Sequence, residues 1–235
     1  PPSPAMRRAR LPPARRLAPI LFATAAAALL GACAKRDPLL TPSPKALSRA
    51  APDSFDVRIE SSRGPFVIRA RRDWSPAGVD RFHYLVRSGY YDEARFFRVV
   101  SGFVVQWGLP ALPAVAAAWE GRSIPDEPVK SSNLRGRVSY ARGGPNTRGT
   151  QLFINLADNA RLDSTNGFGF PPIGEVVEGM AVVDSFNAEY GGTNTDRKPG
   201  PSQAEIRAEG NVYLAREFPR LDFIRTARVV RSWRK

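Results

Sequence analysis

The chain has 235 residues, of which 43% are hydrophobic and 24% are charged, enough to bury the core of one medium-sized domain. Its formal net charge is +13 at pH 7, but five arginines and no acidic residue lie within residues 1–32. The other basic residues alternate with Asp and Glu, so we expect a solvated basic surface and no nucleic-acid binding. A single cysteine and a single histidine exclude an intrachain disulfide and a Cys/His zinc site, and we expect no metal and no cofactor.

The N-terminal segment has the layout of a secretory signal peptide. From the expected start at Met6, an Arg-rich stretch leads into the apolar run LAPILFATAAAALL at residues 17–30. This run is shorter than the roughly 20 residues of a transmembrane helix. The sequence LGAC then ends at Cys33 and resembles a bacterial lipobox, in which the cysteine carries the lipid. We predict a signal peptide at residues 1–32 and lipidation of Cys33; an ordinary signal peptide with a chance cysteine is the alternative.

Residues 33–52 contain four prolines among Ser, Thr and Lys and show no apolar periodicity. This composition is typical of a Pro-rich linker, which would tether a domain at residues 53–235 to the lipid on Cys33. We therefore expect an extracytoplasmic domain that is lipid-anchored to a bacterial membrane, on its periplasmic side or at the cell surface. The choice between inner and outer membrane stays open.

The domain begins with an expected β-hairpin and a helix. Apolar residues alternate with polar ones over residues 55–59 and resume at residues 66–68, after a turn, as in two antiparallel strands. Ser75 and Pro76 offer an N-cap and a first helical residue, and Gly89 offers the end of that helix.

The rest of the domain alternates short strands with loops. We expect strands at residues 96–100, 103–107, 137–140, 151–156, 173–176 and 221–231, a long loop at 109–134 and a second short helix at 178–187. Many short strands, two short helices and no βαβ rhythm predict a mainly β fold, a closed antiparallel barrel capped by the helices.

Residues 96–108, FFRVVSGFVVQWG, set two polar side chains among apolar strand residues. A guanidinium near an apolar surface usually has a specific polar task, because burying an unpaired charge is costly. Arg98 and Gln106 are therefore candidate functional residues. A salt bridge from Arg98 to a nearby acid such as Glu120 or Asp126 is the alternative interpretation.

Three blocks of sequence carry a family signature. The first contains Arg98, Phe103 and Gln106 on adjacent strands; the second reads VSYA, GPNT and QLFI within residues 138–154; the third reads LD and then GEVVEGM. Together they resemble the cyclophilin family of peptidyl-prolyl isomerases over most of the proposed domain. The resemblance implies a closed, eight-stranded antiparallel barrel capped by two short helices.

The resemblance also implies a role for each matched residue. The catalytic set would be Arg98, Phe103 and Gln106, with Arg98 as the catalytic arginine and Phe103 in the pocket for the proline ring. The implied substrate-binding residues are Val104, Ala141, Gln151, Phe153, Leu162 and Asn166, of which Asn166 lies next to an insertion at residues 168–172.

Several positions depart from the family pattern, among them Asn166, the expected counterpart of a residue that is often His or Tyr in the family. Phe97 replaces a histidine, Trp107 stands where a glycine is frequent, and Arg142 replaces an asparagine. Arg161 occupies the place of a tryptophan that some members use to bind cyclosporin. We therefore predict weak cyclosporin binding.

We predict a cyclophilin-type peptidyl-prolyl cis–trans isomerase that acts, as a monomer, on unfolded or flexible proline-containing polypeptides. Rotation about an amide bond needs no nucleophile, metal or proton transfer, which agrees with the scarcity of His and Cys. One alternative is a membrane-tethered module that binds Pro-containing segments with little or no turnover, favoured by the changed residues Arg161 and Asn166. Another is a basic adhesion or scaffold lipoprotein.

Overall fold

The computed structural model describes residues 37–192 and 200–234. The predicted signal peptide, the start at Met6 and the lipidation site Cys33 lie outside the described residues. Of the two compact units, Pro1–Lys35 and Arg36–Lys235, only the second is therefore described. No helix in the described part of the chain is long and apolar enough to cross a membrane.

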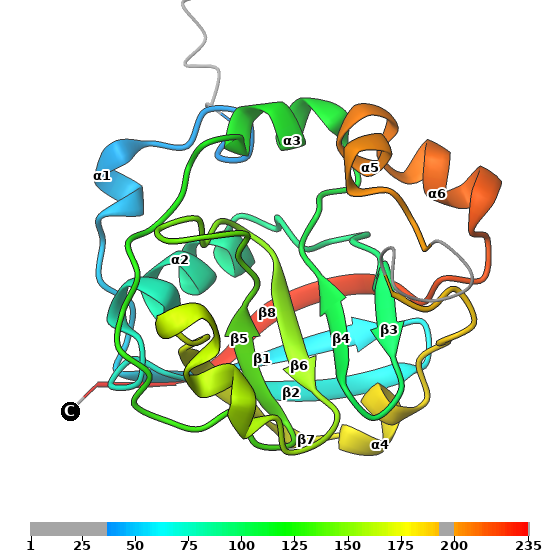
Figure 1. Cartoon of the computed structure of the whole chain (residues 1–235). Coiled ribbons are helices and arrows are strands. Elements are labelled where there is room, and N and C mark those ends of the chain that lie inside the picture. Colours follow the sequence, from blue (N-terminus) through cyan, green and yellow to red (C-terminus); the bar gives the residue numbers. More distant parts are fainter. Residues whose placement is uncertain (1–36, 193–199, 235) are drawn as a thin grey trace, which may run out of the picture. The chain divides into compact units, whose positions relative to one another are not determined.

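One antiparallel sheet of eight strands forms the centre of the domain (Figure 1), in the order β3-β4-β6-β5-β7-β2-β1-β8. Every neighbouring pair is antiparallel, which confirms the prediction of a mainly β, antiparallel fold. The strands are β1 (Ser54–Ser61), β2 (Gly64–Arg71), β3 (Arg98–Val100), β4 (Val104–Trp107), β5 (Arg137–Tyr140), β6 (Leu152–Asn155), β7 (Pro172–Glu178) and β8 (Ile224–Trp233).

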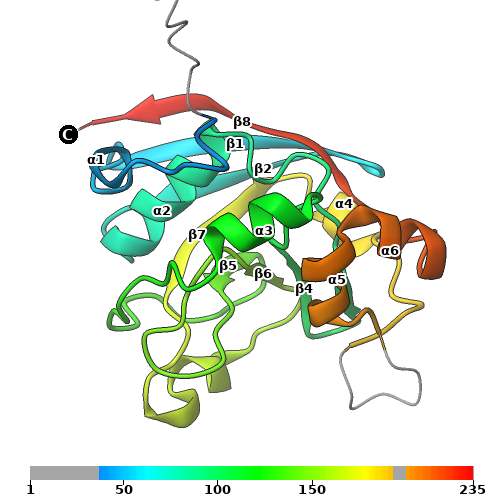
Figure 2. The ribbon, with the colours of Figure 1, turned by 90° about the horizontal axis from the view of Figure 1, so that it is seen from above.

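The sheet is curled, and Figure 2 shows β1, β2 and β8 across from β4, β5 and β6. Within the described residues, the edge strands β3 and β8 share no ladder. The segments that precede them are joined by a single bridge between Arg95 and Phe223. The structure thus has the curled sheet, whereas full closure of the barrel stays a prediction.

The two predicted helices are present as α2 and α4, but the predicted number is wrong, because the described residues contain six α-helices. The other four were not predicted: α1 lies in the stretch predicted as linker, α3 lies inside the stretch predicted as a loop, and α5 and α6 precede the last strand. The helices are α1 (Pro44–Leu47), α2 (Pro76–Arg87), α3 (Pro113–Trp119), α4 (Met180–Asp184), α5 (Gln203–Glu209) and α6 (Asn211–Glu217), with 3₁₀ turns η1 (Ala160–Asp163) and η2 (Thr165–Gly167).

Helix α2 begins at Pro76, as predicted, but its cap comes from a distant residue. Ser75 makes no side-chain cap; its hydroxyl instead donates to the carboxylate of Glu127. That carboxylate accepts from the backbone N–H groups of Ala77 at 2.8 Å and Gly78 at 3.2 Å, and from the guanidinium of the fully buried Arg148 at 2.9 Å. The loop before β5 is therefore fastened to the start of α2.

Residues 37–52, which were predicted as linker, contact the domain. The Trp119 indole donates to the Leu39 carbonyl at 2.9 Å, and the Tyr84 hydroxyl donates to the Pro38 carbonyl at 3.0 Å. The backbone N–H of Ala51 donates to a carboxylate oxygen of α2 at 2.8 Å. This segment therefore lies against α2 and α3.

The alternation of side chains along the strands separates the main core from a second face. Val105, Trp107 and Ile154 are fully buried in the main core. Their strand neighbours Val104 and Phe153 belong to a different apolar cluster, because successive side chains of a strand point to opposite faces. That second face of β4 and β6 carries the candidate site.

Candidate active site

Three site residues form a row across neighbouring strands. Arg98 of β3 lies directly opposite Gln106 of β4, and Gln106 lies opposite Phe153 of β6, so their side chains share one face of the sheet. The Arg98 guanidinium donates from Nη1 to Oε1 of Gln106 at 3.2 Å. Gln106 is only 7% exposed, so this polar row is sheltered from water.

An apolar cluster, the candidate pocket, adjoins the row. Its buried floor consists of Val104, Phe153 and Leu162, with partly buried residues around it. The structure therefore brings five predicted residues together; the complete cluster is Val104, Phe153, Leu162, Phe103, Ala141 and Phe170.

Phe170 was missed by the sequence analysis. Its ring meets the Phe153 ring edge-on, with 5.7 Å between centroids, and its backbone N–H donates to the Leu162 carbonyl at 2.8 Å. The only sequence signal for it was an aromatic residue within the inserted stretch.

Asn166, by contrast, is not brought to the pocket. It lies in η2 with φ 55°, and its side chain is exposed. Asparagine tolerates this left-handed conformation better than most residues, so its conformation suits a tight turn at the rim. Phe170 packs in the pocket instead.

Two guanidinium groups lie over the same aromatic ring. Arg98 is 5.6 Å from the centroid of Phe103, and Arg161 is 4.8 Å from it, both within the range of cation–π attraction. Asp126, the acid considered as a salt-bridge partner of Arg98, pairs with Arg142 at 3.2 Å. The catalytic candidate thus lies between an aromatic pocket wall and the Gln106 amide.

A buried network of polar side chains forms hydrogen bonds to the backbone of residues in the apolar cluster. Asn133, which is fully buried, donates to Asp163 at 2.8 Å and to the Phe170 carbonyl at 2.9 Å. Asn159 donates to the Phe103 carbonyl at 2.9 Å. Burial alone would raise the pKa of the Asp163 carboxyl, but hydrogen bonds from Ser132 and Asn133 outweigh it and lower that pKa. Further contacts join Ser139 and Asn155 to this network.

A chain of side-chain amides leads away from Arg98. Gln106 donates to Oε1 of Gln151 at 2.9 Å, and Gln151 donates to Oε1 of Gln203 at 2.9 Å. All three line a cleft of about 710 Å³. Gln151 was predicted as a substrate-binding residue, whereas Gln203 of α5 was not predicted, since nothing in its own segment marks it.

The departures from the family pattern have structural reasons. Trp107 is fully buried in the main core. Phe97 is buried in a separate cluster with residues of α5 and α6. Arg142 lies over the rings of Phe168 and Phe170, at 5.0 and 5.1 Å from their centroids, and so belongs to the pocket rim.

This geometry places the Arg98 guanidinium beside an apolar cluster of aromatic and aliphatic side chains. Guanidinium stays charged at any physiological pH and offers five donors in a planar fork. Such a site can hold an apolar ring and present a hydrogen-bond donor beside it. The class of protein that fits is one that binds an apolar ring, such as that of proline, next to a hydrogen-bond donor.

The comparison with known families identifies this class. Residues 55–209, more than half of the chain, match the family model described as cyclophilin type peptidyl-prolyl cis-trans isomerase/CLD. The chain belongs to the cyclophilin family of peptidyl-prolyl cis–trans isomerases.

Curated relatives carry the same activity in their names. The chain is 35% identical over 146 residues to peptidyl-prolyl cis-trans isomerase A of Dickeya dadantii, covering 59% of this chain and 74% of that protein. It is 31% identical over 163 residues to peptidyl-prolyl cis-trans isomerase B of Escherichia coli, covering 64% of this chain and 94% of that protein. The chain is a peptidyl-prolyl cis–trans isomerase.

A solved structure agrees with the fold. The cyclophilin type peptidyl-prolyl cis-trans isomerase of Cryptosporidium parvum aligns with a TM-score of 0.56 at 21% identity, covering 76% of this chain and 99% of that one.

Proposed function

We propose that Arg98 catalyses the isomerisation by donating to the imide nitrogen of the substrate. Rotation about an X–Pro bond faces a barrier of roughly 18–20 kcal/mol, because the planar amide is stabilised by resonance. In the twisted state the nitrogen regains its lone pair and can accept a hydrogen bond. A donor aimed at that nitrogen stabilises the twisted state more than either planar state, which lowers the barrier.

The neighbouring side chains would hold the substrate during the rotation. Phe103, Phe153 and Leu162 enclose the proline ring, over the short floor residue Val104. Gln106 and Gln151 offer amide groups to the peptide backbone at the mouth of the cleft, next to Ala141. A solved structure of the Cryptosporidium parvum enzyme was determined in the presence of the dipeptide Ala-Pro, which supports this ligand class.

One observation carries the proposal: Arg98 lies 5.6 Å over Phe103 at the pocket wall while it donates to Gln106. The guanidinium is thus held in place beside the space for the ring. Preorganised donors of this kind contribute about 10²–10³ in rate.

The test is the isomerisation of a short Ala-Pro peptide by wild type, Arg98→Ala and Arg161→Ala. Arg98→Ala should lose about 10²–10³ in kcat/KM. Arg161→Ala is the matched control, because it lies over the same Phe103 ring without a contact to Gln106, and should lose no more than about threefold. Equal losses in both variants would refute a special role for Arg98.

We also propose that the enzyme works outside the cytoplasm, anchored by a lipid on Cys33, as a monomer on unfolded or flexible proline-containing polypeptides. The lipobox-like LGAC sequence after an apolar run supports the anchor. Incorporation of a labelled fatty acid into the full chain, and its loss in Cys33→Ser, tests this part. Absence of label in the wild type would refute it.

The second candidate function is binding of Pro-containing segments with little or no turnover. The changed residues favour it, since Arg161 lies over Phe103 and Asn166 is exposed outside the apolar cluster. The same peptide assay decides, because a pure binding module would show equally negligible rates in wild type and Arg98→Ala.

A further inference from the structure

Helices α5 and α6 lie between β7 and β8 in the sequence, and α5 lies beside α3 in the fold (Figures 1 and 2). A small apolar cluster holds them there. Phe97, the residue before Arg98, is 1% exposed and packs with Ile206 of α5 and Leu214 of α6. The aromatic residue that replaces the family's histidine is therefore the anchor of the helix pair.

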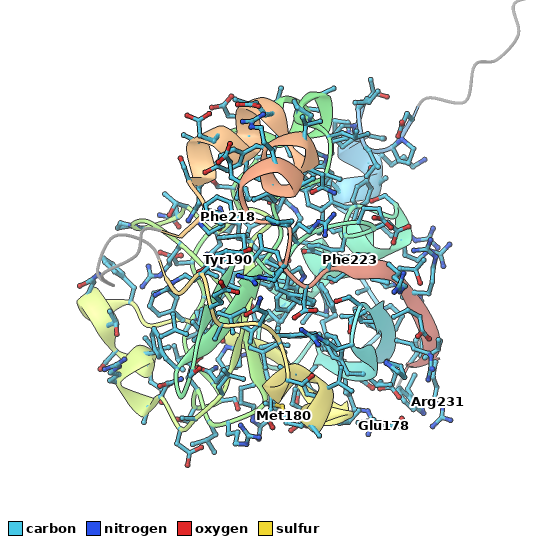
Figure 3. All side chains as sticks on the ribbon, turned by 90° about the vertical axis from the view of Figure 1, so that its right-hand side faces the viewer. Glu178, Met180, Tyr190, Phe218, Phe223 and Arg231 are labelled. Carbon is cyan, nitrogen blue, oxygen red and sulfur yellow. The ribbon has the colours of Figure 1, made fainter. Side chains whose placement is uncertain are left out.

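The turn between the two helices is pressed onto the loop after β4. Gly210 has φ +61°, and a Cβ there would come within 2.1 Å of the Ala111 carbonyl oxygen, so only glycine fits. The next residue, Asn211, donates its backbone N–H to the same carbonyl at 3.0 Å. At the other end, the rings of Tyr190 and Phe218 meet edge-on at 5.1 Å (Figure 3). The helix pair is thus held at several points.

The packing of the helix pair places one polar side chain of α5 next to the site. Gln203, the first residue of α5, accepts at Oε1 from Nε2 of Gln151 at 2.9 Å. The same oxygen faces Nη2 of Arg207, one helical turn further on, at 3.5 Å. Arg207 has no acceptor to offer, so Gln203 keeps its oxygen toward both donors.

The amides from Gln203 to Arg98 all point the same way. Gln106 and Gln151 each donate from the NH₂ group to the oxygen of the next amide farther from Arg98, and Gln106 turns its oxygen toward Arg98. If Gln151 were flipped, its NH₂ would face the NH₂ of Gln106. A flipped Gln106 would in turn present NH₂ to the guanidinium, and two donors cannot bond to each other.

We propose that Gln203 is a positioning residue: its oxygen fixes the amide orientation of Gln151 and Gln106, so that Gln106 presents an acceptor to Arg98. The terminal acceptor decides the polarity of the whole chain, because hydrogen-bonded side chains act as a network. The inference rests on the proposed catalytic role of Arg98. It assigns α5 a part in the reaction beyond packing.

The experiment measures kcat and KM for the Ala-Pro peptide in variants of the whole chain. Gln203→Met keeps the length of the side chain and removes the acceptor, whereas Gln203→Glu keeps an acceptor. Glu205→Ala, an exposed residue of the same helix, is the control. Gln203→Met should lower kcat about fivefold with KM within twofold and an unchanged Tm, as expected for one lost hydrogen bond. Gln203→Glu and Glu205→Ala should stay within twofold of wild type.

A double-mutant cycle separates positioning from an independent effect. In a Gln106→Ala background, Gln203→Met should cause no further loss, because the chain to Arg98 is already broken. Full additivity, a loss in KM alone, or a wild-type rate in Gln203→Met would overturn the proposal. If Arg98→Ala loses activity while Gln203→Met does not, only the positioning role fails; if Arg98→Ala keeps full activity, the catalytic proposal fails with it.

Discussion

Glu127 caps α2 and also pairs with the buried guanidinium of Arg148. Its removal should therefore lower the free energy of unfolding by a large amount. The carboxylate is 14% exposed and its partner Arg148 is 0% exposed. It accepts two backbone N–H groups at the start of α2 and the hydroxyl of Ser75. Glu127→Ala would leave Arg148 as a buried charge without its nearest carboxylate, a change that costs about 3–5 kcal/mol. That is a large part of the 5–15 kcal/mol typical of a domain.

Urea unfolding, followed by tryptophan fluorescence, measures this loss as a drop in the free energy of unfolding. Glu60→Ala is the matched control, since Glu60 pairs with Arg58 at 2.6 Å on the surface and such pairs contribute about 0–1 kcal/mol. The double variant Glu127→Ala with Arg148→Met should be more stable than the sum of the single changes, because no charge stays buried. A loss in Glu127→Ala no larger than in Glu60→Ala would refute the reasoning.

Two further predictions concern the pocket. The folded-state pKa of Asp163 lies below its ordinary value of 3.8, so its contribution to stability is complete above about pH 4 and is lost as the pH falls through the folded pKa. Acid unfolding of Asp163→Asn should therefore be less steep with pH than that of wild type, and equal slopes would contradict the assignment. Arg161→Trp should bind cyclosporin at least roughly tenfold tighter than wild type, because an aromatic anchor replaces a cation over Phe103. Fluorescence titration checks this, and submicromolar binding by wild type itself would show that Arg161 does not weaken the site.

The sequence predicted the parts of the site that lie on neighbouring strands. Arg98, Gln106 and Phe153 are matched by strand register, and the period of two along each strand places Val104 on the same face as Gln106. Their roles were predicted from the resemblance to the cyclophilin family, because the strand pattern alone would have placed Phe153 simply in the core.

The site residues that the sequence did not predict belong to segments that are distant in the sequence from the strands of the site. Gln203 meets Gln151 only because Phe97 and Gly210 dock the helix pair, and Phe170 reaches the pocket through an insertion. Helix α2 is a second example. Its start at Pro76 follows from the residues next to it in the sequence. Its cap comes from Glu127, which is distant in the sequence and so could not be predicted from those residues.

The pairing of β1 with β8 has a consequence for how the chain folds. These strands come from opposite ends of the domain and form a long antiparallel ladder, so the sheet cannot be completed until the last strand is available. The β1–β2 hairpin can form early, since its contacts are local, but the edge of β1 then stays open to other chains. We expect a chain that stops before Ile224 to aggregate rather than fold, even though every residue of the proline pocket precedes that point.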